Sequence, residues 1–276
     1  MKKRLHLISG DLKRALFQWK TLGCILLITG IYFISDVELM QILKDNPVLL
    51  QFFDVVGVYN YVLQIDRFKT LIYIVVAAVY TDSFCREYNT RSAFYLIVRC
   101  GSTDYVLSKV ITIVLSGIFV YASGTAIYLA ILRTMMPWVT DQNNSMYDAG
   151  IFMAMEAMEP RKHPVVYIIL TIVIVSLSLI SLCVVAFFVS ICVHTPLVIV
   201  CIPAVLFFML AAVSQLGTSA LYFPSYGNHN FLSESGNLSW WMTCLIKIII
   251  HLVIIFLFSV LSVAQIKEKI HEGNLY

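Results

Sequence analysis

The sequence predicts an all-α polytopic membrane protein with six transmembrane helices and an amphipathic helix at its N-terminus. Three observations lead to this prediction: 60% of the 276 residues are hydrophobic and only 13% are charged, the mean hydropathy is +0.86, and long apolar runs recur along the chain. Soluble domains are about one quarter charged, so a soluble fold is excluded. The net charge of +3 is too small and too dispersed to predict a nucleic-acid partner.

Residues 1–20 are expected to form a helix that lies on the membrane surface. The apolar side chains of this segment share one sector at about 100° per residue, while Lys3, Asp11 and Arg14 point elsewhere. The apolar set is Leu5, Ile8, Leu12, Ala15, Leu16 and Trp19. A basic amphipathic helix with a tryptophan at its end suits the interface beside anionic lipid. The alternative is a solvated leader.

The first span is expected at Leu22–Ile34, extended by Trp19–Thr21 to the roughly 20 residues that a bilayer requires. The acidic segment Ser35–Asp66 follows on the outer side. Within it, Pro47–Leu63 is interpreted as an outer helix or a re-entrant segment, since polar residues and a glycine interrupt its apolar stretches. These interruptions are Asp54, Gly57 and Asn60.

The second span, Phe68–Phe84, runs into a polar segment, Thr81–Lys109, that separates it from the third span, Tyr105–Leu132. A short helix is predicted over Glu87–Arg99, with Gly101 ending it. Ser102, Thr103 or Asp104 would then cap the next helix. In the third span, Ser116 and Gly117 recur seven residues later as Ser123 and Gly124, which predicts a face small enough for close helix packing.

The second half of the chain supplies three further spans. An outer loop at 133–164 precedes the fourth span, Val165–Val193, which is followed by the fifth span, Pro196–Ser214. Only His194 and Thr195 separate these two spans, which predicts a closely packed hairpin. A second outer loop, 215–239, leads to an interfacial tryptophan pair at 240–241. The sixth span then runs to Ala264, before a cytoplasmic tail at 265–276.

The distribution of basic residues predicts the orientation, because cytoplasmic segments of membrane proteins are enriched in lysine and arginine. With both termini inside, the inner segments contain Lys2, Lys3, Arg4, Lys13, Arg14, Lys20, Arg86, Arg91, Arg99, Lys109, Lys267 and Lys269. The outer segments contain only Lys44, Arg67, Lys69, Arg133, Arg161 and Lys162. We therefore expect a multi-pass protein of the cell membrane, in a bacterial plasma membrane, with cytoplasmic N- and C-termini.

The chain resembles the type-2 ABC transporter permeases, the membrane subunits of ABC exporters. The resemblance consists of the N-terminal amphipathic elbow, the six spans, and an F-x-x-E-x-x-x-R pattern at Phe84, Glu87 and Arg91 between spans two and three. The stretch Arg99–Tyr105 and Ser108-Lys109 then enter the third span, as in that family. One departure is that the usual proline after the loop helix is absent, with Cys100 and Gly101 near its place.

The resemblance implies that residues 1–276 form one permease domain of an exporter for an amphipathic or hydrophobic solute, such as a peptide or antibiotic. Residues 81–104 would be a cytoplasmic coupling loop that docks on a separate ABC ATPase subunit. The expected contact residues are Glu87, Arg91, Phe94, Tyr95 and Arg99. A second permease copy or a homologous permease would complete the pore. Glu87 and Arg91, one helical turn apart, would pair with each other or with the ATPase.

The sequence does not predict catalysis by this chain. It lacks the G-x-x-x-x-G-K-[ST] phosphate loop, so ATP and Mg²⁺ are expected on the partner ATPase and no cofactor on this chain. The alternatives are a non-transport scaffold or immunity protein, and an intramembrane protease-like enzyme. The latter rests on Arg86–Arg91, a faint match to an E-E-x-x-x-R motif without the paired helical histidines.

Two ionisable residues of the sixth span, Lys247 and His251, are candidates for a translocation path because they share one helix face at membrane depth. Lys247 lies about 10 Å from the tryptophan pair along the helix, so its ammonium is expected to reach the interface by snorkelling. No metal site is predicted. The seven cysteines lie in apolar or inner segments, so they are interpreted as buried hydrophobes without disulfides.

Overall fold

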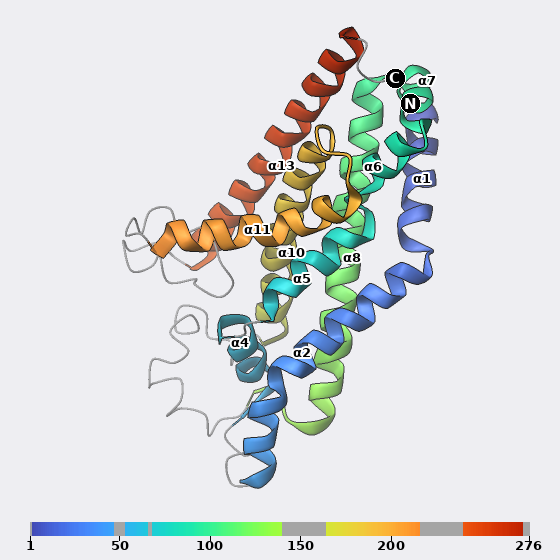
Figure 1. The fold of residues 1–276 in the computed structure, drawn as a ribbon. Helices are drawn as coiled ribbons and strands as arrows, with labels where there is room; N and C mark the ends of the chain where they lie inside the picture. Colours follow the sequence, from blue (N-terminus) through green and yellow to red (C-terminus); the bar gives the residue numbers. More distant parts are fainter. Residues whose placement is uncertain (1, 47–52, 66–67, 140–163, 216–239, 273–276) are drawn as a thin grey trace.

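The computed structural model describes residues 2–46, 53–65, 68–139, 164–215 and 240–272, and every regular element within these ranges is a helix (Figure 1). In chain order the helices are α1 (Lys2–Leu16), α2 (Trp19–Asp45), α4 (Val55–Ile65), α5 (Lys69–Tyr80), α6 (Ser83–Asn89), α7 (Ser92–Cys100), α8 (Ser102–Met135), α10 (Pro164–Ser190), α11 (Pro196–Gln215) and α13 (Trp240–His271). The prediction of an all-α membrane protein is confirmed.

Among the residues that the structure describes, four helices are long and apolar enough to cross a membrane: α2, α8, α10 and α13. α8 is the longest, and its 34 residues extend about 51 Å at the α-helical rise, well beyond a hydrocarbon core of about 30 Å. The apolar helix α5 has only 12 residues. In α11 the apolar stretch Pro196–Leu210 also falls short of the length of a full span. The structure thus shows a multi-pass membrane protein with four such helices.

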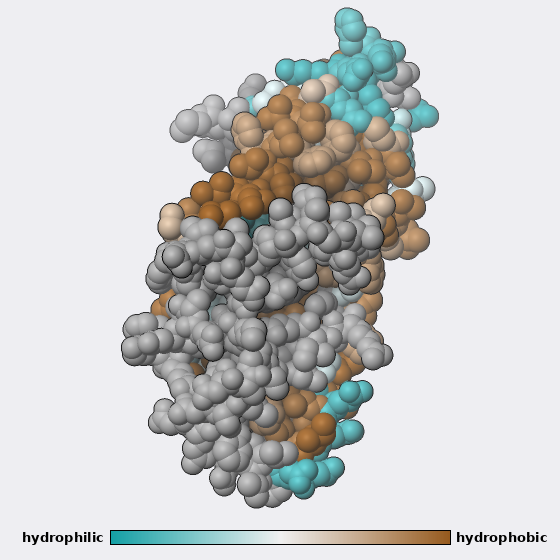
Figure 2. Space-filling view, turned by 90° about the vertical axis from the view of Figure 1, so that its left-hand side faces the viewer, coloured by the Kyte–Doolittle hydropathy of each residue, from teal (hydrophilic) through white to brown (hydrophobic). Residues whose placement is uncertain are grey.

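The surface agrees with an embedded protein. On the face drawn in Figure 2, hydrophobic residues form a band between hydrophilic groups at the two ends of the molecule. The N-terminus, α7 and the C-terminal end of α13 lie together at one end (Figure 1). The helices that meet there contain basic residues, among them Lys13 and Arg14 of α1, Arg99 of α7 and Lys267 and Lys269 of α13.

Two spans extend beyond their predicted limits. α2 continues through Ser35 to Asp45 instead of ending at Ile34, and the first acidic residue of this extension has a partner inside the protein. Asp36 is fully buried and accepts a hydrogen bond from the Tyr128 hydroxyl of α8. α13 likewise continues to His271, and Ile266 is fully buried, so the described part of the predicted tail is helical.

The segment predicted as an outer helix or re-entrant piece contains α4, while 47–52 lie outside the described residues.

The predicted α10–α11 hairpin is not antiparallel. The turn at His194 and Thr195 is present, but α11 runs across the direction of α8 and α10 (Figure 1). It packs on α5, where the Tyr73 and Phe207 rings stack at 4.7 Å between centroids. The outer loops predicted at 133–164 and 215–239 fall mostly outside the described residues.

The polar segment forms two helices where one was predicted. α6 ends at Asn89 and α7 begins at Ser92, and Arg91 between them has a left-handed backbone with φ of 57°. The break arises because hydroxyls close the end of α6: Thr90 Oγ1 donates to the Arg86 carbonyl at 3.0 Å, and Ser92 Oγ to the Glu87 carbonyl at 3.2 Å. Gly101 ends α7 as predicted, with φ of 86°, but no side chain caps the start of α8.

The predicted small-residue face of α8 is confirmed. A methyl group added at Gly124 would lie 2.8 Å from Ile28 Cγ2 and 3.1 Å from the Ile25 carbonyl oxygen on α2. At Gly117 it would lie 3.0 Å from Ile180 on α10. These two glycines therefore set how closely α2 and α10 approach the central helix α8.

Gly124→Ala is expected to lower the thermal denaturation midpoint of the detergent-purified protein. The gain in helix propensity of about 1 kcal/mol is outweighed by overpacking of about 1–3 kcal/mol, because a backbone oxygen cannot move aside. Gly30→Ala on α2 is the matched control, since nothing lies within 4 Å of its added methyl group. An equal midpoint in the two variants would contradict close packing of α2 on α8.

Candidate functional site

A buried ammonium group joins four helices at the end of the molecule that holds the N-terminus and α7. Lys109, on α8, exposes only 1% of its side chain. Its Nζ lies 3.1 Å from Asp11 Oδ1 on α1 and 2.5 Å from Glu87 Oε1 on α6. The same ammonium donates to the Tyr80 hydroxyl of α5 at 3.0 Å. We call Lys109, Asp11, Glu87 and Tyr80 the ion cluster.

Two further hydroxyls satisfy the remaining oxygens of the two carboxylates. Tyr105 donates to Glu87 Oε2 at 2.6 Å, and Ser108 donates to Asp11 Oδ2 at 2.8 Å. Both donors belong to the first turns of α8, so this helix supplies three of the groups that hold the acids. A buried ion pair is stable only when its lone pairs and protons are satisfied in this way. The arrangement is suited to holding α1, α6 and α8 as one rigid unit.

α6 also makes contacts on its other side, with the turn between α10 and α11. The Tyr88 ring stacks on His194 with centroids 3.7 Å apart, and Asn89 Nδ2 donates to the His194 carbonyl at 3.4 Å. The Cys85 thiol points at the Val193 carbonyl at 3.4 Å. Burial raises the pKa of this thiol to about 11, so it remains protonated at neutral pH. Because of these contacts, a displacement of α6 would act on both α8 and α10.

At the start of α6, Asp82 holds an arginine on the same helix. Arg86 donates to both of its carboxylate oxygens, with Nη2 to Oδ2 at 2.7 Å, and Lys20 Nζ approaches Oδ2 at 4.0 Å. The pairing is local at i and i+4. Because Arg86 pairs with Asp82, Glu87 is left to pair with Lys109 in the ion cluster.

α7 presents three different faces. Ala93 and Ile97 are buried against the core. On the outward face, Tyr95 exposes 72% and Val98 exposes 69% of the side chain. These two apolar side chains point away from the buried Ala93 and Ile97. We call Tyr95 and Val98 the outward face of α7.

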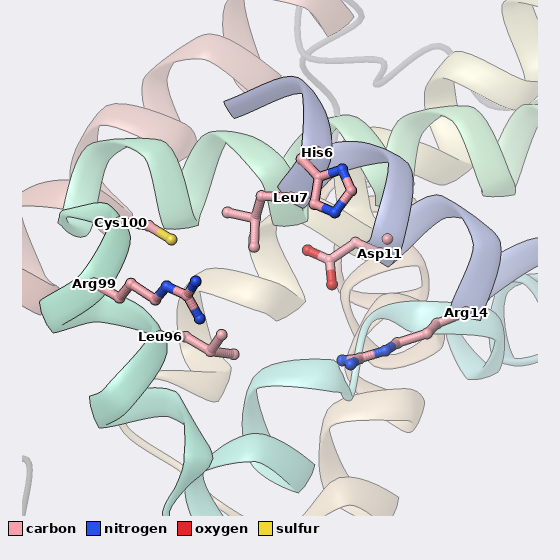
Figure 3. A pocket seen from close by; sticks show the side chains of 8 residues that line it. His6, Leu7, Asp11, Arg14, Leu96, Arg99 and Cys100 are labelled. Atoms are coloured by element: carbon pink, nitrogen blue, oxygen red, sulfur yellow. The ribbon is translucent and has the colours of Figure 1, made fainter. Parts of the chain in front are cut away.

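The third face of α7 lines a pocket shared with α1. Its volume is about 670 Å³, and its lining comprises His6, Leu7, Gly10, Asp11, Arg14, Leu96, Arg99 and Cys100. Figure 3 shows the guanidinium groups of Arg14 and Arg99 extending toward one another from opposite sides. Asp11 is thus common to the pocket and to the ion cluster. We call this cavity the α1–α7 pocket.

The structure distributes the five predicted coupling residues over different environments. Glu87 pairs with Lys109 inside the protein, so the first of its two expected pairings, with Arg91, is wrong, and the pairing with the ATPase stays a prediction. Arg91 is exposed at the break between α6 and α7. Phe94 is half-buried and packs against the core. Arg99 lines the α1–α7 pocket, and only Tyr95 belongs to the outward face of α7.

Lys247 and His251 lie inside the helix bundle. The Lys247 side chain is 5% exposed, so the predicted snorkelling to the interface is wrong. His251 is fully buried, with Nδ1 at 3.1 Å from Ser181 Oγ on α10. Ser181 also donates to the Ser178 carbonyl of its own helix at 2.8 Å. His251 thus contacts α10 and Lys247 is buried within the bundle, and their role in a translocation path stays a prediction.

The sequence did not predict that Asp11 is buried, because the amphipathic pattern assigned it to the solvent face of the N-terminal helix. In the structure it is 4% exposed and lies one turn before Ala15, which is 1% exposed. The spacing of Leu7, Asp11 and Ala15 by four residues marks a stripe that could have identified the buried side. Within the described residues, no group of three or more His, Cys, Asp or Glu side chains is placed to hold a metal ion.

Comparison with models of protein families, with curated proteins and with solved structures finds no match to this chain.

Lys109→Met is expected to lower the free energy of unfolding by about 3–5 kcal/mol, because two carboxylates remain buried without their cation. Denaturation by SDS in mixed micelles measures this change. Lys20→Met is the matched control, with an effect under about 1 kcal/mol, since Lys20 is 38% exposed and 4.0 Å from Asp82.

Neutralising both acids tests the cause of this loss. Adding Asp11→Asn and Glu87→Gln to Lys109→Met should restore most of the lost stability, because the uncompensated charges are then gone. If this triple variant is no more stable than Lys109→Met alone, the loss comes from packing and the ion cluster is not the source.

Proposed function

We propose that this chain is the membrane-spanning permease subunit of an ATP-driven exporter of the type-2 ABC class, with α6 and α7 as the segment that docks on a separate ATPase. The second copy of the permease, or a homologous one, would complete the pore. In this proposal the two ends of the chain are cytoplasmic. The solute is amphipathic or hydrophobic, such as a peptide or antibiotic.

The observation that carries the proposal is the placement of α6–α7 between an exposed surface and the long spans. The outward face of α7 offers Tyr95 and Val98 to a partner. Behind it, Glu87 is fixed to Lys109 on α8 and Tyr88 is stacked on the α10–α11 turn. A force applied to α7 would therefore act on two long helices as a rigid-body movement.

In this proposal Glu87 and Arg91 have different roles in coupling. Glu87 serves as the internal link to α8, and Arg91 is presented at the exposed break between the two helices. The left-handed backbone at Arg91 turns α7 relative to α6. ATP and Mg²⁺ belong to the partner subunit in this proposal, and this chain supplies the mechanical connection.

Six passes through the membrane would require α5 and α11 in addition to the four long helices. These two helices pack on each other through Tyr73 and Phe207. Ile72, Tyr73, Val76 and Ala77 of α5 are all buried, so this helix is shielded by its neighbours. Short helices within a bundle are compatible with a membrane protein when their ends are covered by protein.

The double variant Tyr95→Ser/Val98→Ser tests docking directly. The tagged wild-type protein, extracted in mild detergent, is expected to purify with a stoichiometric ATPase, and the variant to lose it by about tenfold or more, as for interface hot spots. Both residues are exposed, so the denaturation midpoint should not change. Met135→Ser, 61% exposed at the other end of α8, is the control and should retain the ATPase.

Recovery of the wild-type protein alone, without ATPase activity, would overturn the transporter proposal. The scaffold and enzyme alternatives would then be tested instead.

Lys247→Leu tests whether the buried pair of α13 lines the solute path. Removing an ammonium from the path should reduce export of acidic or zwitterionic solutes relative to neutral ones in a transport assay with inverted vesicles, because ionisable groups at membrane depth act on charged cargo. Lys267→Leu removes the same charge at an exposed position of α13 and should leave the profile unchanged. An unchanged profile in Lys247→Leu would remove the pair from the path.

A further inference from the structure

The α1–α7 pocket has the shape and charge of a site for an anionic group. Two arginines from different helices, Arg14 on α1 and Arg99 on α7, direct their guanidinium groups into one cavity of about 670 Å³ (Figure 3). A guanidinium binds phosphate or carboxylate oxygens with two parallel hydrogen bonds. Two such groups that face each other can bind one phosphate from opposite sides.

The acid in the pocket does not neutralise these arginines. Asp11 directs its carboxylate to the ion cluster, where it accepts from Lys109 at 3.1 Å and from Ser108 at 2.8 Å. Neither Arg14 nor Arg99 forms an ion pair with an acidic residue of the described helices. The pocket therefore presents two guanidinium groups, and the His6 ring also lines it.

The depth of the pocket in the membrane is indicated by aromatic residues beside it. Phe17 and Trp19, at the junction of α1 and α2, expose 86% and 89% of their side chains. Tryptophan side chains prefer the level of the lipid headgroups, and Arg14 lies five residues before Trp19 in the chain. The pocket wall also contains the apolar side chains of Leu7 and Leu96. The lining thus combines a site for a phosphate with a surface for hydrocarbon.

We propose that the α1–α7 pocket binds the headgroup phosphate of an anionic phospholipid, with Arg14 and Arg99 on the phosphate and the glycerol backbone against Leu7 and Leu96. The bound phosphate bridges the interfacial helix and the coupling segment, and its oxygens replace water around both guanidinium groups. This assignment does not depend on transport by the chain, so its test can succeed or fail independently of the ATPase experiment.

The binding experiment titrates the full-length protein, purified in a neutral detergent, with short-chain phosphatidylglycerol, short-chain phosphatidylcholine and glycerol 3-phosphate, and counts bound molecules by native mass spectrometry. The wild-type protein is expected to bind phosphatidylglycerol at least about tenfold more tightly than phosphatidylcholine. Arg14→Gln/Arg99→Gln should remove about tenfold or more of that affinity, since each arginine contributes charge-assisted hydrogen bonds.

The matched control is Lys13→Gln/Arg91→Gln, which removes the same charge at exposed positions on the two segments, outside the pocket lining. It should bind phosphatidylglycerol within about twofold of the wild type, because distant charges contribute only screened attraction. Equal losses in the two double variants would show non-specific attraction and overturn the proposal. Glycerol 3-phosphate binding as tightly as the lipid would also overturn it, in favour of a site for soluble phosphate esters.

Alkylation of Cys100 provides a second measurement with an internal reference. Cys100 is half-buried in the lining of the pocket, whereas Cys192 is exposed at the α10–α11 turn. In nanodiscs that contain phosphatidylglycerol, maleimide labelling of Cys100 should slow relative to phosphatidylcholine nanodiscs, with the Cys192 rate unchanged. Peptide mass spectrometry measures both rates. Equal rates at Cys100 in the two lipids would contradict occupancy of the pocket by the anionic lipid.

Discussion

The buried ammonium of Lys109 is the interaction on which the arrangement of this end of the molecule depends. An isolated charge with 1% exposure is far too costly to bury unless its neighbours solvate it. Asp11 and Glu87 do this from two different helices, and Tyr80 from a third. Consequently α1 cannot drift along the membrane surface, and α6 cannot swing away from α8, without exposing a charge to an apolar environment.

This constraint explains why a helix with an amphipathic sequence is held so firmly to the bundle. Most of the binding energy of an interfacial helix comes from burial of its apolar face in lipid, which fixes depth but not direction. The Asp11 carboxylate adds a directional contact, since it must meet both Lys109 and Ser108. Asp11 also lines the α1–α7 pocket, so the contact that holds α1 in the ion cluster also positions α1 beside α7.

Further along α8, hydroxyl groups form a second buried polar cluster. Tyr32, Tyr59 and Tyr121 are fully or almost fully buried, with the Tyr32 and Tyr121 hydroxyls 2.9 Å apart, and Tyr128 donates to the buried Asp36. Within this second cluster, Gly124 lies between Tyr121 and Tyr128 along α8 and lets α2 approach α8 to backbone contact. α8 thus carries groups of both polar clusters, and α2 packs closely against its second half.

The sequence by itself determined that this is a helical membrane protein, because its composition is too apolar for a soluble fold. It also determined the break at Gly101 and the small-residue face of α8, because glycine conformation and helical periodicity depend on a few neighbouring residues. Only the tertiary structure decided the partners of Glu87, the burial of Asp11 and Lys247, and the placement of Arg14 and Arg99 in one pocket. In the chain Asp11 and Lys109 are far apart, and each looks like an ordinary surface charge. Their pairing follows from helix packing, which local patterns do not encode, and the same packing sets the direction of α11 and the length of α2.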